Sequence, residues 1–79
     1  MTVAAKIKLA DARAELRMSQ TALATFASLS KQTIVSAEKG MAIHRISAHA
    51  ILHVLNAERQ ARGMSTLAIT DIDWKIQGE

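Results

Sequence analysis

The sequence contains no cysteine, no proline and no tyrosine, and only one Phe and one Trp. Without cysteine the chain can form neither a disulfide bond nor a thiolate metal site, and nothing indicates an oxidising compartment. The absence of proline favours helices over strands, as does a hydrophobic share of 49% that is rich in Ala, Leu and Ile. We therefore expect an all-α protein.

Long hydrophobic runs are missing as well. No apolar stretch reaches the roughly 18 residues that suggest a membrane span. The first stretch carries Lys6, Lys8 and Asp11 and does not look like a signal peptide. We expect a cytoplasmic protein with no membrane partner. Because 79 residues bury only a modest core, we also expect self-association to a homodimer.

No arrangement of residues indicates catalysis. The chain has no nucleophile beside a base, no glycine-rich phosphate loop and no paired carboxylates in an apolar setting. His49 and His53 lie four residues apart, a spacing that can hold a metal, but no Cys, Asp or Glu lies near them on that helical face. We expect solvated or interface histidines, no metal, no cofactor and no enzymatic activity.

Positive charge is concentrated in the first half of the chain. Residues 1–45 hold seven basic and three acidic residues, a net charge of +4, whereas residues 46–79 hold three basic and four acidic residues, a net charge of −1. Such asymmetry suits a polyanionic partner. Because a basic face is often simply a solvated surface, the charge alone does not identify nucleic acid as the partner.

Apolar periodicity and capping residues predict four helices. Ser19 and Ser30 are good N-cap residues, and Gly40 and Gly63 are natural helix ends. The expected helices are Val3–Arg17, Gln20–Ala27, Lys31–Lys39 and a fourth, capped by Ser47, that runs to Arg62.

The fourth helix has two apolar stripes. Ala48, Ile51, Leu52 and Leu55 are expected to cover the core, while Ala50, Val54, Ala57 and Ala61 form a second stripe. Apolar residues nearly alternate in the tail, as in a strand, although Thr70 could instead cap a short helical turn. We expect a domain over residues 1–63 and a packing or dimerisation tail over residues 64–79. Ala50, Val54, Ala57 and Trp74 are the candidate residues for dimer or tail packing.

The most informative stretch is Ser19–Gly40, in which a tight turn joins two short capped helices. Ala24 is small enough to let the helices cross closely, and the flanking apolar residues are Leu23, Ala27, Leu29 and Ile34. The run SQTALATFASLSKQTIVSAEKG resembles the DNA-binding motif of the lambda-repressor/Cro-like (XRE-type) helix-turn-helix family and aligns with it without a gap. This resemblance extends loosely over residues 7–56. It implies a compact four- to five-helix DNA-binding domain.

The resemblance also implies an ion pair between Arg13 and Glu38, which would lock the first helix against the third. Three positions depart from the family pattern. Ser28 replaces a glycine at a position prone to positive φ, Ala37 is smaller than the usual Leu or Ile, and Val35 occupies an outward site that is commonly polar.

With the third helix in the major groove, the residues that reach base edges are expected to be Lys31, Gln32, Val35 and Ser36. By resemblance, Gln20 contacts the DNA backbone. The other expected backbone contacts are Thr21, Ser30, Thr33, Lys39 and Arg45. These residues together predict a sequence-specific regulator of transcription, a repressor that binds a palindromic operator as a homodimer. The alternative is an antitoxin-like DNA-binding subunit that also binds a partner toxin protein. A third reading, a helical module that binds protein only, is disfavoured because the outward face of the third helix is polar.

Overall fold

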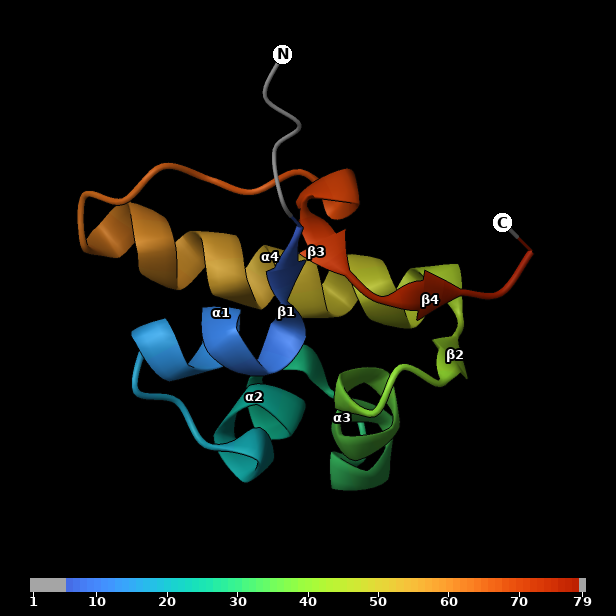
Figure 1. The fold of residues 1–79 in the computed structure, drawn as a ribbon. Helices are drawn as coiled ribbons and strands as arrows, with labels where there is room; N and C mark the ends of the chain where they lie inside the picture. Colours follow the sequence, from blue (N-terminus) through green and yellow to red (C-terminus); the bar gives the residue numbers. More distant parts are fainter. Residues whose placement is uncertain (1–5, 79) are drawn as a thin grey trace, which may run out of the picture.

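The computed structural model describes residues 6–78, in which the long helix α4 packs over three shorter helices and a short extended tail follows α4 (Figure 1). The long helix α4 lies across the shorter α1, α2 and α3, and the chain after α4 returns along it (Figure 1). In chain order the elements are β1 (Ile7–Lys8), α1 (Leu9–Glu15), α2 (Gln20–Ala27), α3 (Lys31–Glu38), β2 (Ala42–Ile43), α4 (Arg45–Ala61), the 3-10 turn η1 (Ile69–Asp71), β3 (Ile72–Asp73) and β4 (Lys75–Ile76).

Both predicted serine caps are present. Ser19 Oγ accepts a hydrogen bond from the Ala22 amide at 3.0 Å, and Ser30 Oγ accepts one from the Thr33 amide at 3.3 Å. Each bond satisfies a backbone donor that the helix itself leaves open. Helix α2 has the predicted bounds, and α3 ends one residue early, with Lys39 as its C-cap. Gly40 then adopts a φ of +83°, the left-handed conformation that commonly ends a helix.

The starts of the first and fourth helices were predicted wrongly. Helix α1 begins at Leu9, because Ile7 and Lys8 are extended and pair with β3; Val3 lies outside the described residues. Helix α4 begins at Arg45, so Ser47 lies inside it and the N-cap is His44, whose side chain makes no cap hydrogen bond. The preceding strand β2 is paired with β4, which holds the chain extended up to this point and so sets where the helix begins.

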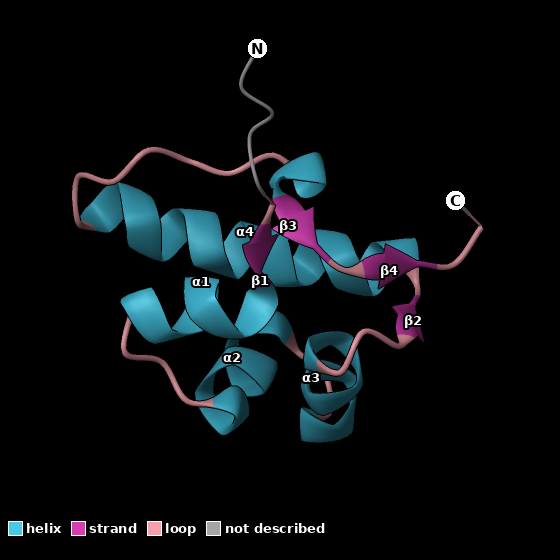
Figure 2. Cartoon of the chain, viewed as in Figure 1, coloured by secondary structure: helices cyan, strands magenta, loops and turns pink. Residues whose placement is uncertain are grey.

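The protein is mostly helical but not strictly all-α. Two parallel pairs of two-residue strands join the tail to the rest of the domain (Figure 2). In one pair Ile7 is opposite Ile72, and in the other Ile43 is opposite Ile76. The near-alternation of apolar residues in the tail therefore corresponds to strands only from Ile72 onward. The break in the alternation lies in η1, whose N-cap is Ala68 rather than Thr70.

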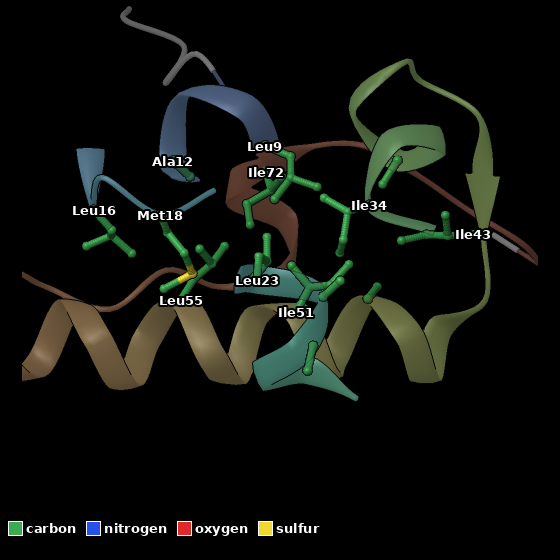
Figure 3. Close-up of a cluster of buried hydrophobic side chains, with 14 residues drawn as sticks. Leu9, Ala12, Leu16, Met18, Leu23, Ile34, Ile43, Ile51, Leu55 and Ile72 are labelled. Carbon is green, nitrogen blue, oxygen red and sulfur yellow. The ribbon is translucent and has the colours of Figure 1, made fainter. Parts of the chain in front are cut away.

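The core lies between α4 and the three shorter helices, and the tail contributes to it (Figure 3). Leu23, Ile34, Ile51, Leu55 and Ile72 have exposed fractions of 0%. Three of the four expected core residues of α4 are fully buried, and Leu52 is partly buried. Since Ile72 belongs to the tail, residues 64–78 complete the same core. None of the helices in the described part of the chain combines the length and apolarity that a bilayer crossing needs.

Candidate nucleic-acid interface

A tight turn of three residues joins α2 to α3, and the two helices pack against each other. Ser28 adopts the left-handed conformation, with φ +58° and ψ +39°, and the Leu29 amide donates to the Ala24 carbonyl at 2.8 Å. Ala24 itself is buried, as are Leu23 on α2 and Ile34 on α3. Ala24 is thus part of the same buried core as Leu23 and Ile34.

Helix α3 presents its polar side chains outward. Lys31 and Gln32 are exposed, Val35 and Ser36 are partly buried, and Ile34 and Ala37 point into the core. Gln32 Nε2 donates to Ser36 Oγ at 3.3 Å, one helical turn further on. The four residues expected to reach bases therefore lie on the accessible side of one short helix, and none of them is enclosed by the protein.

The residues expected to contact the DNA backbone are distributed over three helices. Thr21, Ser30, Lys39 and Arg45 are exposed, and Gln20 and Thr33 are partly buried. Ser30 and Thr33 share a hydrogen bond between their hydroxyls at 3.0 Å at the start of α3. These side chains come from the starts of α2, α3 and α4 and from the end of α3.

The expected ion pair between Arg13 and Glu38 is present. Arg13 Nε lies 2.7 Å from Glu38 Oε2, and Arg13 Nη2 donates to Glu38 Oε1 at 3.2 Å, which makes the pair bidentate. Arg13 Nη1 also donates to the Met18 carbonyl at 2.9 Å. The pair therefore ties α1 and the loop that follows it to the end of α3.

Glu38 has a second partner that the sequence did not predict. Gln20 Nε2 donates to Glu38 Oε1 at 2.9 Å. Burial by itself would raise the pKa of Glu38, but hydrogen bonds from Arg13 and Gln20 and the charge of Arg13 together lower it. The Arg13 guanidinium pKa is raised, chiefly by its hydrogen bond to Glu38. Both groups are therefore held in their charged forms, and their charges offset each other.

No local pattern connects Gln20 with Glu38, because the two residues lie 18 positions apart on different helices. The contact arises only when the start of α2 is packed near the end of α3. The packing of α1 against the end of α3 sets the net charge here. With Glu38 paired with Arg13, the charges left on α2, α3 and the C-cap of α3 are those of Lys31 and Lys39.

The residues expected to mediate dimer or tail packing mostly contact their own chain. Ala50, Val54 and Trp74 pack against the core, whereas Ala57 is exposed. Trp74 Nε1 donates to the Ile69 carbonyl at 3.1 Å, which holds the indole within the tail. His49 and His53 are exposed on α4, and residues 6–78 contain no group of three or more side chains arranged to hold a metal ion.

Comparisons with protein-family models, with curated proteins and with solved structures yield no match for this chain. Support for a function therefore comes from the residues and from their geometry. The described residues include a short helix with an exposed side, a helix packed against it, and exposed or partly exposed hydroxyl, amide and basic side chains on these helices and at the start of α4. Such a surface can donate hydrogen bonds to phosphate and can read base edges.

Proposed function

We propose that this chain is a sequence-specific double-stranded DNA-binding protein, a small transcriptional repressor that acts as a homodimer on a palindromic operator. The observation that carries the proposal is the division of α3 into a buried side, with Ile34 and Ala37, and an accessible side that begins with Lys31 and Gln32. An α-helix with its side chains is about as wide as the major groove of B-DNA. The resemblance of residues 19–40 to the lambda-repressor/Cro-like motif supports the same docking.

The position of Lys31 favours a functional role for its charge. It is the first residue of α3, where the helix dipole is positive and a cation is unfavourable, and the first turn contains no acidic residue to offset it. The charge therefore does not stabilise the helix. A cation at this position gains a favourable interaction when the helix end approaches polyanionic DNA.

In the proposed complex the accessible side of α3 reads the bases. Gln32 forms two hydrogen bonds with adenine, Lys31 donates to guanine, and Val35 contacts a thymine methyl group. Gln20, Thr21, Ser30, Thr33, Lys39 and Arg45 contact phosphates and set the register without reading sequence. Two copies related by a two-fold axis would place their α3 helices about one DNA turn apart, and occupation of such an operator would block transcription.

Selection of bound duplexes from a random pool, with light scattering of the complex, tests this proposal. We expect a palindromic consensus bound by two copies. Gln32→Ala should relax the base preference at one position of each half-site, whereas Gln60→Ala, a change at another exposed glutamine, should not. A consensus with a single half-site bound by one copy would contradict the dimer. Failure to enrich any sequence would contradict specific DNA binding.

Lys39 provides a separate check on the phosphate contacts. Lys39→Ala should weaken binding to all duplexes alike and reduce the slope of log affinity against log salt by about one. Lys6→Ala, at an exposed lysine just before β1 and outside the proposed contacts, serves as the control and should leave the slope unchanged. Equal effects of the two substitutions would show that the attraction is a general charge effect and not a contact made by the end of α3.

A further inference from the structure

The contact between Gln20 and Glu38 lies where α2 begins, at one of the proposed phosphate contacts. Gln20 is the first residue of α2 and is partly exposed, while the side chain of Glu38 is only 9% exposed. Glu38 Oε1 accepts from Gln20 Nε2 at 2.9 Å and from Arg13 Nη2 at 3.2 Å. One carboxylate thus links α1, the start of α2 and the end of α3.

The chemistry of the carboxylate fixes how the Gln20 amide is oriented. An ionised carboxylate only accepts hydrogen bonds, so the NH2 group of the amide, and not its oxygen, must face Glu38. One N–H is used in this bond and the other stays available to a further acceptor. A free glutamine side chain samples many rotamers and has a broad terminal torsion, so the bond to Glu38 removes freedom that a phosphate contact would otherwise have to remove.

Arg13 makes this arrangement compatible with a nearby phosphate. An unpaired carboxylate beside the start of α2 would repel DNA, but the bidentate pair with Arg13 offsets its charge. Glu38 can therefore hold the amide without adding net negative charge at the interface. The two roles are thus divided: Arg13 offsets the charge of Glu38, and Glu38 orients the Gln20 amide.

We propose that Glu38 is a positioning residue for DNA binding, which holds the Gln20 amide so that its second N–H meets a phosphate at the start of α2. This inference rests on the proposed DNA-binding function. Glu38 acts through Gln20 and does not itself touch DNA. Its effect on affinity should therefore disappear when the Gln20 amide is absent.

A double-mutant cycle on the selected duplex tests this coupling. Glu38→Ala should weaken binding about 3- to 10-fold in the wild-type background, the cost of ordering one glutamine side chain, and by less than twofold in the Gln20→Ala background. Affinities are measured at a temperature where circular dichroism shows every variant folded. A merely structural role would give equal losses in both backgrounds and would overturn the inference.

Two further measurements keep the test decisive if Glu38→Ala does not fold. Replacing single phosphates by neutral methylphosphonates in the selected duplex should reveal one phosphate whose loss abolishes the effect of Gln20→Ala. In the wild-type chain, the side-chain ¹⁵N–H signals of Gln20 should shift when the unmodified duplex is added and should not shift with the duplex modified at that phosphate. Unchanged Gln20 signals on a duplex that binds would overturn the positioning role alone, whereas absence of any bound duplex would overturn the proposed function as well.

Discussion

Asn56 on α4 and Leu67 in the tail exchange two hydrogen bonds. Asn56 Nδ2 donates to the Leu67 carbonyl at 2.9 Å, and the Leu67 amide donates to Asn56 Oδ1 at 2.8 Å. A side-chain amide thus satisfies both backbone groups of one tail residue, as a neighbouring strand would. Arg59, on the same helix, makes a further hydrogen bond to the tail: its Nε donates to the Ser65 carbonyl at 2.6 Å. These contacts place the segment between α4 and η1 along the helix that precedes it.

Asn56→Ala should destabilise the fold by about 1–3 kcal/mol, because it leaves two partly buried backbone groups without partners. Asn56→Asp keeps the acceptor for the Leu67 amide but sets a carboxylate against the Leu67 carbonyl, so it should also be destabilising. Urea unfolding followed by circular dichroism measures both effects. A free energy of unfolding that is unchanged in both variants would show that the tail does not depend on this contact.

Ile72→Ala should be among the most destabilising single substitutions in the tail. The Ile72 side chain is fully buried, and truncation of such a residue costs about 2–5 kcal/mol. Ile46→Ala is the matched control, since Ile46 is 83% exposed and its truncation should change the free energy of unfolding by less than about 0.5 kcal/mol. Similar losses in the two variants would contradict the placement of Ile72 in the core.

Stability should fall in acid through Glu38. Its pKa is lowered in the folded chain, so the free energy that it contributes is fully present above the carboxyl pKa of the unfolded chain. That contribution is lost as the pH falls through the lower pKa of the folded state. Urea unfolding across this range should show a smaller decline in the Glu38→Gln variant than in the wild type. Parallel declines in the two proteins would mean that other carboxylates account for the acid sensitivity.

Ser28→Gly should stabilise the domain by roughly 0.5–1 kcal/mol. Ser28 has a φ of +58°, and an L-residue with a Cβ pays a steric cost there that glycine avoids, although glycine loses more backbone entropy on folding. Ser28→Ala keeps the Cβ and removes the hydroxyl, so it should bring no gain. Thermal unfolding compares the three proteins, and a lower melting temperature for Ser28→Gly than for the wild type would contradict the argument.

The sequence predicted best where structure is decided locally. Ser19 and Ser30 cap their helices, and Gly40 follows the end of α3. Helical periodicity correctly predicts that Ile34 and Ala37 of α3 are buried while Lys31 and Gln32 are exposed. These features depend on residues within one or two turns of each other. The outward face of α3 could therefore be predicted residue by residue.

Prediction failed where distant segments meet. Ile7 and Lys8 look like the continuation of a helix until Ile72 and Asp73, 65 positions away, are available to pair with them. The start of α4 at Arg45 likewise follows from the pairing of Ile43 with Ile76. A local sequence pattern carries no information on which distant residues pair. The hydrogen bond between Gln20 and Glu38 could not be predicted for the same reason.

Backbone and side-chain NMR mapping of the selected duplex on the ¹⁵N-labelled chain tests the central claim most directly. We predict that the largest shift changes fall on residues 30–36 and on the start of α2, with the side-chain signals of Gln32 among them, while the exposed positions His49, His53 and Ala57 of α4 change little. Changes centred on α4 or on the tail, with α3 unaffected, would contradict the docking of α3 in the major groove.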